Sequence, residues 1–170
     1  MTIRPVSKVI LSNLASQGKG ARTSTSPHNA EDKLPKRWLS RALNVRYVDA
    51  GGGQDCANEL NLAFGPDYDL ERLGVRLVAS PRHADLLLVA GCVTTKMASP
   101  LEMTYNAIAK PKLVVAFGDS AITGGPFLEA KHCFGAVESV IPVDFSIPGD
   151  PPSAAEVVDF FYQLTGRIPK

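Results

Sequence analysis

The sequence predicts an α/β fold with a mainly parallel sheet. Segments of strand type alternate with segments of helix type, which is the pattern of a parallel sheet covered by helices. Two strand segments, Leu86–Ala90 and Leu113–Phe117, are continuous apolar runs, and such runs are typical of strands buried on both faces. With 170 residues and 45% hydrophobic content, the chain can bury one core of ordinary size. We therefore expect one flavodoxin-like three-layer sandwich.

Each expected helix is bounded by residues that begin or end helices. Gly65 and Pro66 end the first helix, Ser99 and Pro100 offer an N-cap and a first helical position for the second, and Ser153 caps the third. The expected strands are 45–48, 75–79, 86–90, 113–117 and 140–143. The expected helices are 57–64, 101–109 and 154–164.

A basic segment precedes this domain. Residues 1–48 contain nine Lys and Arg against two acidic residues, a net charge of +7, whereas residues 49–170 contain nine against fifteen, a net charge of −6. We expect residues 1–43 to be a largely disordered arm with a short amphipathic lead-in around Trp38, and residues 44–170 to form the domain. Three interpretations of the arm stay open: a solvated tail, a segment lying on an anionic membrane or a partner, and an organellar transit peptide.

Composition and motifs disfavour several classes of function. No apolar stretch approaches the roughly 20 residues that span a bilayer, so we expect the protein to be soluble by itself. The three cysteines are too few for a disulfide framework; we interpret Cys92 and Cys133 as small buried hydrophobic residues. The loop Gly51–Gly53 matches no phosphate-binding motif, which argues against a nucleotide site. Nucleic acid is not expected as a partner, because no aromatics are interleaved with the basic residues of the arm.

Three loops are expected to meet at the carboxyl edge of the sheet, where open α/β proteins build their sites. They are 49–56, 118–121 and 148–152. Their sequences include Gly53-Gln54-Asp55-Cys56, Gly118-Asp119-Ser120 and Gly149-Asp150-Pro151-Pro152.

The words S-P-R-H-A-D, V-A-G-C-V-T and K-M-A-S-P, which follow one another between residues 80 and 100, resemble a known family. This is the small, cluster-carrying subunit shared by respiratory complex I (NADH:quinone oxidoreductase) and membrane-bound [NiFe] hydrogenases of the formate hydrogenlyase type. The resemblance runs from about Val45 to the C-terminus. It implies a [4Fe–4S] cluster that passes electrons to or from quinone or the [NiFe] centre.

The resemblance also implies partners and a location. The partners would be a large hydrogenase-type or complex I-type subunit, a ferredoxin-like subunit and membrane ion-translocating subunits. The chain would lie on the cytoplasmic side of the inner membrane as a peripheral protein.

In the family, the cluster ligands lie in the words C-x-x-C, G-D-C or G-A-C, and G-C-P-P. At the matching positions this sequence has Gly53, Cys56, Ser120 and Asp150. Only Cys56 offers a soft thiolate, whereas the serine hydroxyl and the carboxylate are hard ligands. We therefore expect that the cluster is lost and that Cys56 is at best a doubtful metal ligand.

Two alternatives to a lost cluster stay open. One is an intact cluster of the family type. The other is an unusual metal site made by Cys56, Asp55, Asp119 and Asp150.

A second group of residues is expected to contact a partner or quinone. The resemblance implies that the region before the central strand faces the large subunit and that the loop after it, residues 94–98, lies near the quinone-site or active-site interface. A cation, an imidazole and a soft apolar side chain suit a mixed interface. The group consists of Arg82, His83, Thr95, Lys96 and Met97. The alternative is that Arg82 pairs with a local acid, His83 is an ordinary surface histidine and Met97 fills the core.

The sequence therefore predicts a subunit of a complex I-like or group 4 hydrogenase-like membrane-associated redox complex, with its cluster lost and a structural bridging role. Whether it contributes to an oxidoreductase activity is left open. One alternative is a genuine electron-transfer subunit, of quinone reductase or hydrogenase type, that still binds an iron–sulfur cluster. Another is a free-standing α/β binding module.

Overall fold

The structure is a computed structural model that describes residues 42–166 of the 170-residue chain. The predicted arm and the lead-in around Trp38 lie outside the described residues, except for the last residues of the arm. There the first described strand, β1 (Leu43–Asp49), already begins. That residues 1–41 are disordered therefore stays a prediction from their composition.

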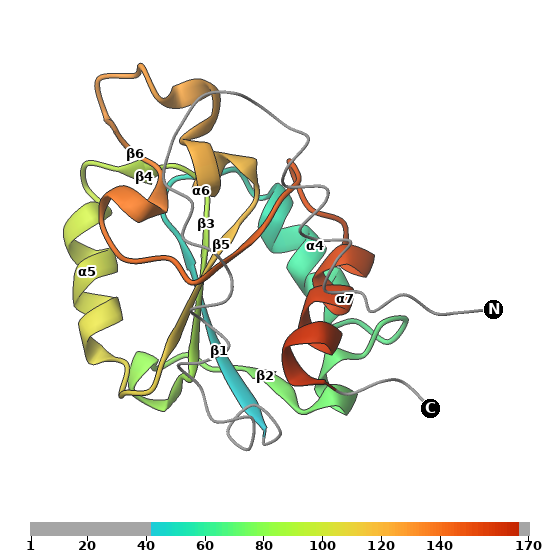
Figure 1. The fold of residues 1–170 in the computed structure, drawn as a ribbon. Coiled ribbons are helices and arrows are strands. Elements are labelled where there is room, and N and C mark those ends of the chain that lie inside the picture. Colours follow the sequence, from blue (N-terminus) through green and yellow to red (C-terminus); the bar gives the residue numbers. More distant parts are fainter. Residues whose placement is uncertain (1–41, 167–170) are drawn as a thin grey trace, which may run out of the picture.

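A five-stranded parallel sheet forms the centre of the molecule (Figure 1). Its strands are β1 (Leu43–Asp49), β2 (Val75–Leu77), β3 (Leu86–Ala90), β5 (Leu113–Phe117) and β7 (Phe145–Ile147). The spatial order is β2-β1-β3-β5-β7, which is the flavodoxin order when these strands are counted along the chain. The predicted fold class is confirmed.

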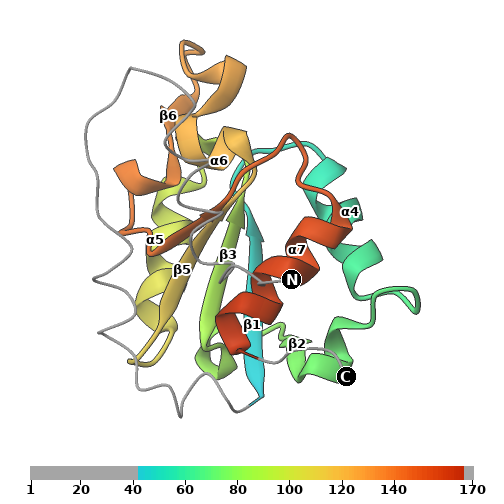
Figure 2. The same cartoon turned by 45° about the vertical axis from the view of Figure 1, so that its right-hand side comes forward.

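Helices cover both faces of this sheet. Helices α4 (Asp55–Ala63) and α7 (Ala154–Thr165) pack on one face, and α5 (Ala98–Ala107) and the short α6 (Asp119–Thr123) lie on the other (Figures 1 and 2). Along β3, Leu86 and Leu88 point into the α4–α7 layer, whereas Leu87 and Val89 point into the α5 layer. Because both faces are buried, the strand is apolar at every position.

The fifth strand lies further along the chain than predicted, so the prediction of a strand at 140–143 is wrong. Residues Val137–Ser139 form a 3₁₀ turn, η4, and Pro142 has no amide hydrogen to donate to a neighbouring strand. Asp144 directly precedes the observed strand, β7 (Phe145–Ile147). The Asp144 carboxylate accepts from the Val114 amide at 2.9 Å, and the Asp144 amide donates to the Val114 carbonyl oxygen at 2.9 Å.

Asp85 makes the same two kinds of hydrogen bond, through its carboxylate and its amide, to a residue of β1. It immediately precedes β3, and its carboxylate accepts from the Asn44 amide at 2.9 Å. Its own amide donates to the Asn44 carbonyl at 2.8 Å. Asp85 and Asp144 therefore lie at the amino ends of two strand pairs, β1/β3 and β5/β7, and each bonds both backbone groups of its neighbour.

The helices are present where they were expected, with shifted ends. Helix α5 begins at Ala98 with Met97 as its N-cap, so Ser99 is not the cap. The Leu101 amide already donates to the Met97 carbonyl at 2.9 Å. The cap of α7 is confirmed, because the Ser153 side chain accepts from the Glu156 amide and the Glu156 carboxylate accepts from the Ser153 amide.

Three elements near the carboxyl edge were not predicted. Helix α6 follows β5 directly, and a small antiparallel pair, β4 (Val93–Thr94) and β6 (Cys133–Gly135), lies beyond the end of β3. Helix α4 begins two residues earlier than expected, which puts Cys56 in its first turn.

Candidate functional site

The candidate site lies at the carboxyl edge of the sheet, where the strand order reverses between β1 and β3. In open α/β sheets this reversal separates the loops on either side and leaves a crevice. Here the two loops approach so closely that only glycine fits. A Cβ on Gly91, whose φ is +75°, would lie 2.0 Å from the Gly52 nitrogen. The Asp49 carboxylate holds the first loop by accepting from the amides of Gly51 at 3.0 Å and Gly52 at 2.8 Å.

The three loops converge as the sequence predicts, and they surround a pocket of about 230 Å³. This volume is below the roughly 300–1,000 Å³ of typical small-molecule sites, so the pocket suits a small group. The lining residues come from the loops after β1, β3, β5 and β7. They are Gly51, Gly52, Gly53, Asp55, Cys92, Ser120, Pro126, Phe127 and Asp150. Three of the four positions that match the family's ligands, Gly53, Ser120 and Asp150, therefore face one space.

Asp119 joins the second loop to the third. Its carboxylate accepts from the Gly149 amide at 3.0 Å, and its amide donates to the Gly149 carbonyl at 2.8 Å. Ser120 follows in the first turn of α6 and is half-buried. The position of Asp150, directly after Gly149, is thus fixed relative to Ser120 by backbone hydrogen bonds.

Cys56, the fourth position, lies in the first turn of α4 directly after Asp55, which lines the pocket, but is not itself among the lining residues. Its Sγ is 4.0 Å from the Phe117 carbonyl oxygen, and a Cβ on Gly118 would lie 3.1 Å from it. Burial raises the pKa of the Cys56 thiol to about 11, and the carboxylates of Asp150, Asp55 and Asp49 raise it in the same direction. The thiol is therefore protonated at neutral pH when no metal is bound, and a metal ion would have to displace this proton in order to bind the thiolate.

The residues present do not fit a [4Fe–4S] cluster of the family type. Such a cluster needs soft anionic sulfur ligands, and one thiol stands where four are required. The carboxylates that oppose ionisation of Cys56 would also repel an anionic cluster. The unusual metal site considered above has no support either: within residues 42–166, no three His, Cys, Asp or Glu side chains are grouped so that they could hold a metal ion.

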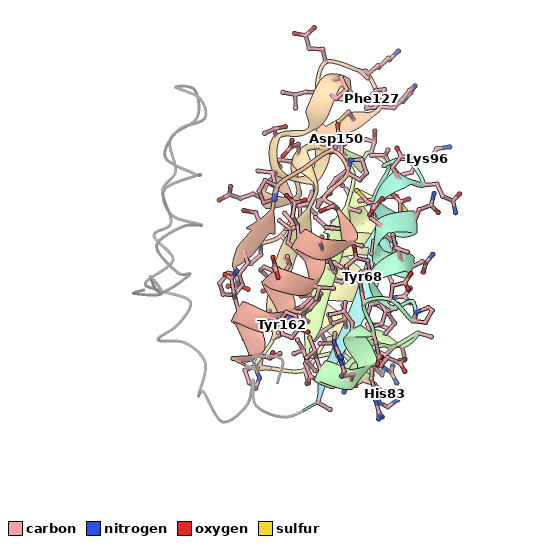
Figure 3. All side chains as sticks on the ribbon, turned by 90° about the vertical axis from the view of Figure 1, so that its right-hand side faces the viewer. Tyr68, His83, Lys96, Phe127, Asp150 and Tyr162 are labelled. Carbon is pink, nitrogen blue, oxygen red and sulfur yellow. The ribbon has the colours of Figure 1, made fainter. Side chains whose placement is uncertain are left out.

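The structure divides the predicted interface residues between the two ends of the sheet. Arg82 and His83 lie in the 3₁₀ turn η2 (Pro81–His83) before β3, whereas Thr95 and Lys96 follow β4 beyond its other end. The five residues of β3 separate the two groups by about 16 Å. Figure 3 shows His83 at one end of the molecule and Lys96, Phe127 and Asp150 at the other.

The residues within this group differ in exposure. Arg82, His83, Thr95 and Lys96 are exposed. Met97 is half-buried and packs against the core on the α5 face, which agrees with the alternative that it fills the core. Only Thr95 and Lys96 therefore remain as freely exposed candidates for an interface at the pocket end.

An exposed apolar surface beside the pocket was not predicted. We call it the apolar loop surface; it consists of Phe127, Leu128 and Phe134, whose side chains are 58%, 54% and 52% exposed. Phe127 also lines the pocket. The sequence signal was an apolar pair directly after the flexible word Thr123-Gly124-Gly125-Pro126, in a stretch without helix or strand periodicity.

Within residues 42–166, no helix has both the length and the apolar character needed to cross a membrane.

Comparison with known proteins shows the family to which the chain belongs. Residues 54–164 match the family model described as NADH ubiquinone oxidoreductase, 20 Kd subunit. An uncharacterized protein of Methanocaldococcus jannaschii, MJ0516, is 42% identical over 134 residues, which cover 79% of this chain and 90% of that protein. Formate hydrogenlyase subunit 7 of Escherichia coli is 36% identical over 130 residues, or 76% of this chain, which spans about half (51%) of that subunit.

A solved structure agrees with these relatives. One chain of the membrane-bound sulfane sulfur reductase, described as an archaeal respiratory membrane complex, is 30% identical and superposes with a TM-score of 0.67. The match covers 77% of this chain and 72% of that one. The predicted resemblance is confirmed: with its parallel sheet and its three converging loops, the chain belongs to the family of the 20 kDa subunit of NADH–ubiquinone oxidoreductase.

Proposed function

We propose that this chain is a structural subunit of a complex I-like or group 4 hydrogenase-like membrane complex and that it has lost the [4Fe–4S] cluster of its family. Family membership and relatives from formate hydrogenlyase and from a respiratory membrane complex support the first part. One observation carries the second part. The positions that match the family's ligands come together, but Gly53, Ser120 and Asp150 bring no thiolate to the pocket.

The proposed role is to bridge a large hydrogenase-type or complex I-type subunit to a ferredoxin-like subunit and to membrane ion-translocating subunits, from the cytoplasmic side of the inner membrane. The apolar loop surface supports a protein partner, because three large apolar side chains of one short segment are each more than half exposed. Exposed Thr95 and Lys96 lie at the same end of the sheet and would add polar contacts at its rim.

The test is anaerobic reconstitution of the full-length chain with iron and sulfide. We expect a colourless protein with far less than one cluster per chain, because three of four thiolates are missing. A near-stoichiometric iron content together with an EPR signal of a reduced [4Fe–4S] cluster would contradict the proposal. It would instead favour a genuine electron-transfer subunit.

A matched gain-of-function variant makes the negative result informative. The triple substitution Gly53→Cys, Ser120→Cys and Asp150→Cys would restore four thiols around the pocket. A Cβ at Gly53 meets only the Asp55 carboxylate oxygen, at 2.9 Å, and this flexible group can move aside. Replacing Asp150 also removes the largest carboxylate influence on the pKa of Cys56.

We expect the triple variant to take up a cluster under conditions in which the unchanged chain does not. If the variant folds but stays colourless while Cys56 is open to alkylation, the loops no longer have the geometry of a cluster site. The assignment of the four positions would then be wrong.

A further inference from the structure

Two cysteines that the proposed function does not use lie next to each other at the edge of the pocket. Cys92 follows β3, is 3% exposed and lines the pocket, and its Sγ donates to the Gly51 carbonyl oxygen at 3.6 Å. Cys133 is the first residue of β6 and is half-buried. The interpretation as a small buried residue is therefore confirmed for Cys92, whereas Cys133 is only half-buried.

The pairing of β4 with β6 brings the two residues side by side. Cys133 pairs with Thr94, and the register shifts between Val93 and Thr94. Cys92 directly precedes β4 and lies two positions before Thr94. The side chains of Cys92 and Thr94 both lie against Gly51: the Cys92 Sγ donates to its carbonyl oxygen, and a Cβ on Gly51 would lie 2.5 Å from the Thr94 Cγ2. Cys133, which pairs with Thr94, therefore lies beside Cys92. The backbone carbonyl oxygen of His132 accepts hydrogen bonds from both the amide and the hydroxyl of Thr95, each at 2.9 Å. These bonds hold the residue before β6 in place.

The two thiols also interact directly. Burial raises the pKa of Cys92, and the neighbouring Cys133 side chain raises it further. A thiol with a raised pKa and no access to solvent is a poor first target for an oxidant. Cys133 is therefore the thiol that a small reagent reaches first.

We propose that Cys92 and Cys133 form a thiol–disulfide modification site that exchanges with small disulfides of the glutathione class. The Cys133 thiolate attacks one sulfur of glutathione disulfide, and one glutathione thiolate leaves. Cys92 then gives its proton to the glutathione thiolate that has left and attacks the Cys133 sulfur, so that the Cys133–glutathione bond breaks and the second glutathione leaves as a thiolate and is protonated by water. The protein is oxidised from two thiols to one disulfide, and glutathione disulfide is reduced to two glutathione molecules.

The bond would join the wall of the pocket to the segment that carries the apolar loop surface. Cys92 lines the pocket, and Phe134 of that surface directly follows Cys133. In Figure 1, β4 and β6 lie side by side at the carboxyl edge of the sheet. Oxidation would therefore fix the apolar loop surface relative to the pocket without touching Cys56.

The experiment incubates the reduced full-length chain with glutathione disulfide, unfolds it in acid and counts the thiols that remain open to alkylation. The chain has three free thiols at the start, and we expect one afterwards. Peptide mapping without reduction should then show a single bond between Cys92 and Cys133. A stable glutathione adduct on Cys133, or a bond that includes Cys56, would overturn the proposal.

Two single substitutions provide the matched controls. Cys56→Ser should lose both of its remaining thiols on oxidation, because the pair is intact. Cys133→Ser, at a half-buried position that tolerates a hydroxyl, should keep both of its thiols, because Cys92 is out of reach of the reagent. If Cys133→Ser becomes modified at Cys92 as quickly as the unchanged chain, Cys133 is not the first thiol to react and the proposed sequence of steps is wrong.

Discussion

The reactivity of Cys56 measures how strongly its surroundings oppose ionisation. Burial and three carboxylates raise the pKa of this thiol from 9.0 to about 11, which lowers the thiolate fraction at pH 8 about a hundredfold. A more basic thiolate is also a better nucleophile. With a Brønsted coefficient of roughly 0.4–0.5, the higher pKa makes the reaction of each thiolate about sixfold to tenfold faster, which offsets part of this loss. We therefore expect Cys56 to react with iodoacetamide at least about tenfold more slowly in the folded chain than in the unfolded chain.

The assay is site-resolved mass spectrometry of alkylation, with the native chain and the same chain in urea as the two arms. In the native arm the rate should keep rising until about pH 11, whereas in urea it should level off near the ordinary cysteine pKa. Because the folded state holds the proton more tightly, the free energy of unfolding should also fall as pH rises from 9 towards 11.

Asp150→Asn separates electrostatics from access to the reagent. It removes the largest of the carboxylate influences and should speed alkylation of Cys56 in the native chain. Asp159→Asn, an exposed substitution on α7, is the matched control and should leave the rate unchanged. If native Cys56 reacts as fast as the unfolded thiol, or if the two substitutions act alike, the carboxylates do not control this thiol and electrostatics no longer oppose a cluster.

Two further predictions concern docking and stability. The double substitution Phe127→Ser and Leu128→Ser should strongly reduce co-purification with a large-subunit homologue, whereas Met103→Ser, at a 69% exposed position on α5, should not; equal retention of both would exclude the apolar loop surface as an interface. Ser153→Ala should lower the free energy of unfolding by about 1 kcal/mol in urea titrations, because it removes the capping box of α7. Gln163→Ala, exposed on the same helix, should have almost no effect, and a loss of equal size there would contradict the proposed role of the cap.

The central strands β3 and β5 could be predicted to the residue, whereas the bounds of β1 and β2 were shifted and the edge strand β7 was misplaced. β3 and β5 are continuous apolar runs, a pattern that only burial on both faces explains. Near β7, apolar residues lie on both sides of Pro142, so the pattern leaves open on which side pairing begins. The backbone bonds of Asp144 decide this, and they depend on a neighbouring strand that is distant in the sequence.

The convergence of the loops was predictable, whereas the local shape of the site was not. In a parallel sheet all carboxyl ends meet at one edge, so topology alone brings Gly53, Ser120 and Asp150 together. The predicted interface residues lie in two groups, because Arg82 and His83 precede β3 whereas Thr95, Lys96 and Met97 follow β4 beyond the other end of β3; their contact with a partner stays a prediction. β4 and β6 are two and three residues long, too short to leave a periodic signal, and the contact between Cys92 and Cys133 depends on them.

The paired bonds of Asp85 and Asp144 have a consequence for how such a fold tolerates change. Both carboxylates lie at the amino ends of their strand pairs and bond the backbone on the neighbouring strand, so a shift of one residue in either pairing would lose them. The alignment of the sheet is thus secured at the end opposite to the pocket. We therefore expect substitutions at the pocket end to leave the alignment of the strands unchanged, so that changes in the chemistry of the pocket and in the stability of the sheet can be separated.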